Sequence, residues 1–251
     1  MPIKISFVGK GGTGKTTLSA LLVNYFIDQK QTPILVVDAD PNFNLNELLG
    51  VEIETTLSEI REELLKGDTP EFMSRYDYVE MRVNEALIET KDFDLLVMGY
   101  PETSGCYCPV HAFLSNSLEK LMNNYPYVII DNEAGMEHIS RLNLREMEHL
   151  IIVSDANPRG ILTGGRIAEL VRALKIQVSN LWLIVNQSPE IISEDLKSYT
   201  EEITKKYNIK LLGFLPEDPN ILNYELKHIP VFEWQTLLKT KAYELFNLLW
   251  E

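Results

Sequence analysis

The chain has 251 residues, of which 45% are hydrophobic and 24% charged, and its formal net charge is −14. This length and composition can form one large α/β core without disulfides or a second domain. Binding to the phosphate backbone of DNA or RNA depends on clustered Lys and Arg, so the excess of carboxylates predicts no nucleic-acid partner. No apolar run approaches the about 20 residues of a membrane span. The N-terminus leads directly into a strand pattern that carries Lys4 rather than into a signal peptide, so we expect a cytoplasmic protein without a membrane partner.

The first predicted elements are a buried strand at residues 3–8 and a helix that begins near Lys15, and they flank a glycine-rich loop. The loop, residues 9–16, has the sequence Gly-Lys-Gly-Gly-Thr-Gly-Lys-Thr, a complete Walker A motif in the strand, loop and helix order that it requires. Backbone N–H groups of such a loop surround phosphates, the lysine reaches the β- and γ-phosphates, and the hydroxyl of Thr16 is placed to hold Mg²⁺. The predicted nucleotide contacts here are Gly9, Lys10, Gly11, Gly12, Thr13, Gly14, Lys15, Thr16 and Thr17.

Lys10 is an additional lysine in the second position of this loop. An exposed loop lysine is ordinarily solvated surface. A lysine placed among phosphate-binding glycines is instead expected to contact the phosphates of its own subunit or of a facing subunit.

The second predicted strand, residues 34–37, is followed by Asp38 and Asp40. Side chains at i and i+2 leave a strand on the same side, so both carboxylates can face the nucleotide. We expect one to act on the Mg²⁺ shell and the other to orient the attacking water. The alternative is that these residues are helix N-caps.

Residues 50–92 form an acidic stretch that predicts two helices separated by a break at residues 67–70, and we expect a helical insertion into the fold here. The only two cysteines, Cys106 and Cys108, follow it in a Gly-Cys-Tyr-Cys-Pro sequence. A disulfide between them is disfavoured by the strain of so small a ring and by a reducing cytoplasm, and a pair of buried unreactive thiols is the other alternative.

Two thiolates are half of an ordinary metal site, because a closed site has about four ligands. Two copies of the loop that meet on a two-fold axis can supply four sulfurs to one ion. Tetrahedral thiolates suit Zn²⁺ and a planar set suits Ni²⁺, so the sequence leaves both metals open. His111 can ligate, but a lone loop histidine more often makes a local hydrogen bond.

Further predicted strands lie at residues 95–98, 127–130, 150–153, 181–185 and 211–214, with helix-like segments between them. Asp131 ends the predicted strand at residues 127–130, in the place of a Walker B carboxylate for Mg²⁺. The final helix, residues 234–250, has too few cations for a membrane-surface helix and is predicted to pack on the core. The alternation predicts a mostly parallel sheet of about seven or eight strands with helices on both faces. Together with the Walker A loop, it predicts a single α/β P-loop NTPase domain, residues 1–251.

Over nearly the whole chain, the loop with Lys10, the Asp38-Ala39-Asp40-Pro41 segment and Asp131 resemble the deviant Walker A ATPases of the MinD and ParA class, which includes the nitrogenase iron protein. The resemblance implies an ATP-bound homodimer in which Lys10 crosses the interface and Asp40 positions water. It also implies that Asn186 contacts adenine and that a late loop flanks the nucleotide, at Pro216, Glu217 and Asp218.

Three further segments resemble the CooC-type maturation ATPases: residues 105–108, residues 131–141 and residues 154–160. This resemblance implies that Cys106 and Cys108 bind Ni²⁺ or Zn²⁺ at the dimer interface. It further implies nickel delivery to a client such as carbon monoxide dehydrogenase or acetyl-CoA synthase, with hydrolysis of ATP to ADP as the switch. For Glu137 and His138 we expect a structural role in a switch loop rather than catalysis.

Two alternatives belong to other functional classes. The cysteines of two subunits can hold an iron–sulfur cluster, as in the nitrogenase iron protein, although the spacing of the cysteines disfavours it. A positioning ATPase that acts on DNA or a membrane is disfavoured by the acidity and by the final helix.

Overall fold

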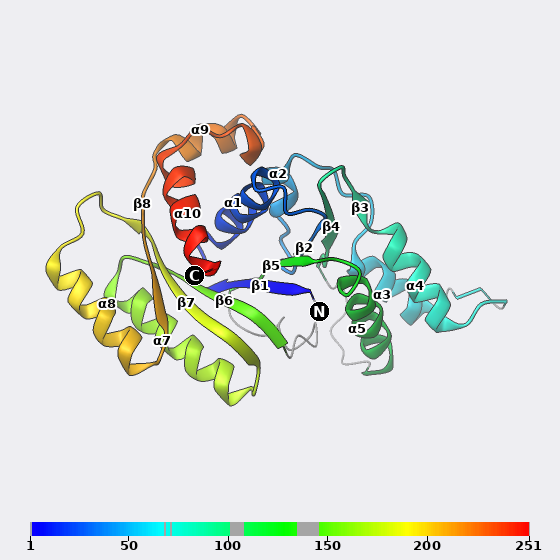
Figure 1. The fold of residues 1–251 in the computed structure, drawn as a ribbon. Helices are drawn as coiled ribbons and strands as arrows, with labels where there is room; N and C mark the ends of the chain where they lie inside the picture. The colour runs from blue at the N-terminus through cyan, green and yellow to red at the C-terminus, as the bar shows by residue number, and fades with distance from the viewer. Residues whose placement is uncertain (1, 68, 71, 101–107, 135–145, 251) are drawn as a thin grey trace.

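The structure is a computed structural model that describes residues 2–67, 69–70, 72–100, 108–134 and 146–250, with the side chains of residues 108–111 left out. Its described part contains one eight-stranded sheet with the order β3-β4-β2-β5-β1-β6-β7-β8 (Figure 1). Neighbouring strands are parallel except for β3 and β4. The strands are β1 (Ile3–Gly9), β2 (Ile34–Asp38), β3 (Ile88–Glu89), β4 (Phe93–Val97), β5 (Tyr127–Asp131), β6 (Glu146–Asp155), β7 (Gln177–Ser188) and β8 (Lys210–Pro216). The predicted α/β fold with a mostly parallel sheet is therefore confirmed.

Helices cover both faces of this sheet (Figure 1). They are α1 (Lys15–Asp28), α2 (Leu45–Leu49), α3 (Leu57–Lys66), α4 (Arg75–Glu85), α5 (Cys108–Met122), α7 (Pro158–Ala173), α8 (Glu194–Lys206), α9 (Asn220–Leu226) and α10 (Leu237–Asn247), with 3₁₀ turns at Val231–Glu233 and Leu248–Trp250. Of the helices within the described ranges, none combines the length and the apolar character that a membrane crossing needs.

Alternating side chains of the central strands form the two cores. In β2, Ile34 and Val36 join the core beneath α1 and α10, whereas Leu35 and Val37 join the core beneath α3, α5 and α7. All four are fully buried. Successive side chains of a strand point to opposite faces, so a strand covered on both faces needs an uninterrupted apolar run, which is what the sequence has here.

The final helix packs on the core, as predicted. Leu238, Ala242 and Phe246 of α10 are buried in the same core as α1. Tyr25 of α1 makes edge-to-face ring contacts with Tyr243 and Phe246. The apolar side of α10 is therefore buried against the core of the same chain.

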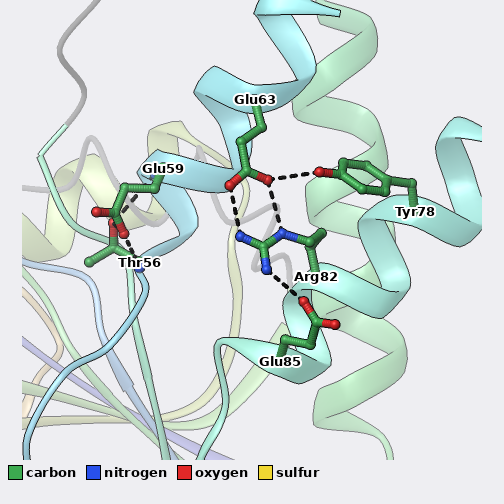
Figure 2. A network of polar contacts seen from close by, with 6 residues as sticks. All are labelled: Thr56, Glu59, Glu63, Tyr78, Arg82 and Glu85. Atoms are coloured by element: carbon green, nitrogen blue, oxygen red, sulfur yellow. Dashed lines mark hydrogen bonds and ion pairs between the residues drawn. The ribbon is translucent and has the colours of Figure 1, made fainter. Parts of the chain in front are cut away.

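Residues 50–92 contain α3, α4 and the short edge strand β3, with the helix break near residue 67 as predicted. A capping box between Thr56 and Glu59 starts α3. The carboxylate of Glu63 accepts hydrogen bonds from Arg82 Nε at 2.9 Å, Arg82 Nη2 at 2.7 Å and the Tyr78 hydroxyl at 3.0 Å (Figure 2). Arg82 also donates to Glu85. The bidentate pair fixes α3 against α4, and α4 in turn packs on α5.

The parallel arrangement determines where chemistry can occur. Because β1, β2, β5, β6, β7 and β8 run in one direction, their carboxyl ends meet at one edge of the sheet. Ligands of open α/β sheets bind in the crevice outside the carboxyl ends of the strands. The predicted site residues other than the cysteines all lie at these strand ends or shortly after them.

Candidate functional site

The Walker A residues form a loop between the end of β1 at Gly9 and the start of α1 at Lys15. Gly12 and Gly14 have φ values of 78° and 87°, which side chains rarely adopt. A Cβ on Gly14 would lie 2.5 Å from the side-chain nitrogen of Asn186. Glycine at residue 14 thus serves both the backbone conformation and the close approach of β7.

Lys15 lies inside this loop and is only 7% exposed. Its ammonium donates a hydrogen bond to the backbone oxygen of Lys10 at 3.3 Å. Burial lowers the pKa of Lys15, and the charges of Asp131, Asp40 and Glu133 oppose that shift. A partly desolvated cation beside this loop is well suited to bind phosphate oxygens, because attraction between charges strengthens as water is excluded.

Lys10 has the opposite environment. Lys10 is exposed. Its backbone oxygen accepts hydrogen bonds from Lys15 Nζ and from the Thr13 hydroxyl, the latter at 2.9 Å. The side chain is therefore free to reach a group outside the loop. Its contact with the phosphates of a facing subunit remains a prediction.

Asp38 and Asp131 lie side by side at the ends of β2 and β5, where the strand register pairs them directly. Both are 0% exposed. Burial raises the pKa of Asp38 to about 7, with the Asp131 charge acting in the same direction and hydrogen bonds from the backbone N–H of Asp40 and Leu45 opposing it. Burial raises the pKa of Asp131 to about 6 against hydrogen bonds from Thr16 and Ser19 and the charge of Lys15. Two carboxylates held this close in a dry site favour the arrival of a cation.

The two oxygens of the Asp131 carboxylate have different surroundings. Its Oδ1 accepts a hydrogen bond from Ser19 Oγ at 3.1 Å, while Oδ2 is buried without a partner of normal geometry among the described residues. The Thr16 hydroxyl is close enough to lower the pKa of the carboxyl. Carboxylate and hydroxyl oxygens are ligands that Mg²⁺ prefers, so the residues present fit the predicted ion.

Both oxygens of the Asp38 carboxylate accept hydrogen bonds from the backbone. Its Oδ1 accepts from the Asp40 N–H at 3.0 Å and its Oδ2 from the Leu45 N–H at 3.1 Å. It therefore fixes the chain between β2 and α2, which is close to the capping alternative. Asp40 is partly exposed and accepts from the Asn42 N–H at 2.9 Å. The Mg²⁺ role of Asp38 and the water-positioning role of Asp40 stay predictions.

The two raised pKa values predict how the stability of the nucleotide-free chain depends on pH. A carboxyl whose pKa is higher in the folded than in the unfolded state binds extra protons when folded, so the free energy of unfolding falls as pH rises from about 4 to about 7. We expect the Mg²⁺-free protein to be less stable at pH 8 than at pH 6. Asp131→Asn should be more stable than the wild type at pH 8 and should show a weaker dependence. Urea unfolding at both pH values measures this.

The matched control for Asp131→Asn is Asp195→Asn, which makes the same change of charge at an exposed residue of α8. It should keep the wild-type dependence on pH. Equal slopes for wild type and Asp131→Asn would contradict the coupling of the buried acids.

Two amides at the end of β7 contact the loop. Asn186 Nδ2 donates to the Thr13 oxygen at 2.9 Å, and Gln187 Nε2 donates to the Gly12 oxygen at 3.1 Å. Asn186 is 4% exposed, and its Oδ1 is buried without a partner among the described groups, which leaves an acceptor for its predicted contact with a base amine. Sequence reasoning missed Gln187, since a residue next to Asn186 on a regular strand would point the other way. It also missed Ser19, which a helical spacing of three from Thr16 could have revealed.

The late loop lies at the same edge. The Glu217 N–H donates to the Ser188 oxygen at 3.1 Å, which ties the end of β8 to β7. The Asp218 carboxylate accepts from the backbone N–H of Asn220 at 3.0 Å and of Leu238 at 3.2 Å, so it caps the starts of α9 and α10. Contacts of Pro216, Glu217 and Asp218 with a nucleotide remain predictions.

The thiols cannot be placed in the same way. Cys106, Glu137 and His138 lie outside the described residues, and Cys108 and His111 belong to α5 with side chains that are not described. Within the side chains that the structure does describe, no group of three or more His, Cys, Asp or Glu is arranged to hold a metal ion. Metal binding by Cys106 and Cys108 therefore remains a prediction from sequence.

Comparisons with known proteins agree with this geometry. Residues 5–231 match the CobQ/CobB/MinD/ParA nucleotide binding domain. An uncharacterized ATP-binding protein of Methanocaldococcus jannaschii is 40% identical over 232 residues, which are 91% of this chain and 90% of that protein. The carbon monoxide dehydrogenase accessory protein CooC of Rhodospirillum rubrum is 26% identical over 262 residues, covering 99% of this chain and 97% of that protein.

One similar solved structure is the septum site-determining protein MinD of Pyrococcus horikoshii complexed with Mg-ADP. It has a TM-score of 0.68 and 22% sequence identity, and the match covers 98% of this chain and 94% of that chain. A likeness at this identity concerns the fold.

Proposed function

Because the chain belongs to the CobQ/CobB/MinD/ParA nucleotide-binding family, we propose that it is an ATP-hydrolysing metallochaperone. In this proposal ATP joins two copies of the chain, four thiolates from the two Cys106–Cys108 pairs hold one Ni²⁺, and hydrolysis to ADP releases the ion to a nickel enzyme. Carbon monoxide dehydrogenase and acetyl-CoA synthase are the client classes.

The observation that supports ATP hydrolysis is that Asp38 and Asp131 pair at the ends of adjacent β2 and β5, within electrostatic reach of Lys15 at the start of α1. The buried lysine attracts the β- and γ-phosphates, and the loop N–H groups orient them. Thr16 and Asp131 would hold Mg²⁺, which would neutralise phosphate charge when bound.

The chain's own residues then do the positioning. The charge of Asp40 opposes the lowering of the Lys15 pKa by burial, so this carboxylate acts on the same site and can orient a water molecule for in-line attack. Lys10 of a second copy stabilises the charge that develops on the transferred group. Phosphoryl transfer depends mainly on such positioning and charge stabilisation.

The support for nickel comes from the sequence and from one relative. Both cysteines of the chain are placed two residues apart, and thiolates select soft or borderline metals. CooC of Rhodospirillum rubrum, a carbon monoxide dehydrogenase accessory protein, is similar along almost the whole chain. A nucleotide shifts the equilibrium between separate chains and the dimer only if it binds one of them more tightly than the other. In this proposal ATP and ADP differ in their contact with Lys10 of the second chain.

The test is a metal titration of the anaerobic protein with Ni²⁺, with and without a nonhydrolysable ATP analogue, followed by molar mass from light scattering. We expect one Ni²⁺ per two chains and a dimer in the presence of the analogue. The Cys106→Ser/Cys108→Ser variant should lose at least about 100-fold in nickel affinity, since removing thiolates removes the ligands. Its ATP affinity should not change.

Three outcomes would contradict the proposal. One is a monomer with the analogue bound, and another is wild-type nickel binding by the double variant. The third is charge-transfer absorption after anaerobic reconstitution with iron and sulfide, which would favour an iron–sulfur protein instead.

A further inference from the structure

The end of β7 makes an unusual contact with the phosphate-binding loop, because two consecutive residues reach it. Asn186 Nδ2 donates to the oxygen of Thr13, and Gln187 Nε2 donates to the oxygen of Gly12. The two acceptors are consecutive as well. A pair of neighbouring amides thus holds a pair of neighbouring carbonyls.

A regular strand could not do this, because successive side chains point to opposite faces of the sheet. Gln187 has a φ of 53°, a left-handed conformation that is uncommon for a residue with a side chain. The register between β7 and β8 shifts between Val185 and Ser188. An irregularity of this kind turns a side chain toward a new direction, and here it brings Gln187 to the same loop as Asn186. Backbone strain that persists at a strand end is typical of functional positions.

The geometry of the peptide group gives this contact a consequence. In a planar trans peptide, the C=O of one residue and the N–H of the next point in opposite directions. Holding the oxygens of Gly12 and Thr13 toward β7 therefore directs the N–H groups of Thr13 and Gly14 away from β7. Within the part of the chain that the structure describes, neither N–H donates to another protein group.

We propose that Gln187 is a positioning residue of the nucleotide site, which fixes the peptide group between Gly12 and Thr13 so that the Thr13 N–H faces the phosphates. Asn186 does the same for the next peptide group, between Thr13 and Gly14. Both N–H groups belong to the part of the loop that would hold the phosphates shared by ATP and ADP. Gln187 therefore sets the affinity for both nucleotides and leaves the chemical step unchanged. This inference rests on the proposed binding of ATP at residues 9–16.

Two substitutions separate the side-chain contact from the backbone conformation. Gln187→Met keeps the length of the side chain and removes the N–H donor. Gln187→Gly also removes the donor, but glycine adopts the observed φ without strain. If the amide matters, both variants lose the same amount. We expect ATP and ADP each to bind about 3- to 10-fold more weakly, which is the ordinary value of one neutral hydrogen bond.

The measurements are ATP and ADP affinity by calorimetry, KM and kcat for hydrolysis, and the melting temperature without nucleotide. KM should rise with kcat unchanged in both variants. The nucleotide-free melting temperature of Gln187→Met should stay within about 2 °C of the wild type, because the contact is exposed at the surface.

Wild-type affinity in Gln187→Gly or in Gln187→Met would overturn the inference, and so would a loss of kcat without a change in KM. These results presuppose a wild-type chain that binds nucleotide. A wild-type chain that bound neither ATP nor ADP would instead refute the proposed function, so the two failures are distinguishable.

Discussion

Lys15→Ala is expected to weaken the binding of ATP and ADP about 10- to 100-fold, since a hydrogen bond to a charged group contributes about 1.5 to 3 kcal/mol. Hydrolysis should fall by at least about 1000-fold, because the phosphates lose their cation and their alignment together. Lys15 is 7% exposed and already partly desolvated, so little of this attraction is screened by water. Calorimetric titration with each nucleotide and a phosphate-release assay measure the two effects.

Lys91→Ala is the matched control, because it removes one lysine at an exposed position of the β3–β4 connection. It should keep wild-type affinity and rate. Nucleotide binding by Lys15→Ala within about twofold of the wild type would mean that the loop does not hold phosphates in the expected way.

Lys10→Ala is expected to lower hydrolysis at least about 100-fold while nucleotide binding by the separate chain is nearly unchanged, as for a cation supplied in trans to the transition state. The structural reason is that Lys10 is exposed and that its hydrogen bonds within the loop are made by its backbone oxygen. Asp40→Asn is also expected to be inactive, because a neutral amide orients an attacking water less well than a carboxylate. Neither variant is expected to unfold, since both residues are at least partly exposed.

A mixing experiment then determines on which subunit Lys10 acts. If it acts across a two-fold interface, a dimer of one Lys10→Ala chain and one Asp40→Asn chain contains one complete site. That site combines Asp40 of the first chain with Lys10 of the second. Random pairing of equal amounts should restore about a quarter of wild-type activity, since about half of the dimers are mixed and each has one working site of two.

No restoration on mixing, with both variants still forming dimers, would mean that Lys10 serves the phosphates of its own subunit. Wild-type hydrolysis by Lys10→Ala alone would remove it from the catalytic residues. The first result would weaken the link between ATP and metal release, because that link needs a contact between subunits that senses the γ-phosphate.

The structure shows that two acids of the predicted site also hold the backbone of neighbouring turns. Asp38 and Asp218 both follow strand ends, which made them candidates for the nucleotide site. The Asp38 carboxylate accepts from the backbone N–H of Leu45, the first residue of α2. The Asp218 carboxylate accepts from the backbone N–H of Leu238, in the first turn of α10. A strand-end acid predicts the edge of the sheet where it lies. The acid's position does not predict which backbone N–H groups will donate to its carboxylate, because those N–H groups belong to turns that the residue pattern does not specify.

The sequence by itself predicted every strand of the described sheet except β3, and it identified the Walker A loop at residues 9–16. The strands are marked by short uninterrupted apolar runs and the loop by its glycines, which are local properties. Only the tertiary structure decided that Asp38 and Asp131 are neighbours in a buried pair and that Gln187 turns toward Gly12. Strand order and an irregular register bring these residues together across more than 90 positions of the chain, and such long-range contacts leave no local pattern in the residues that make them.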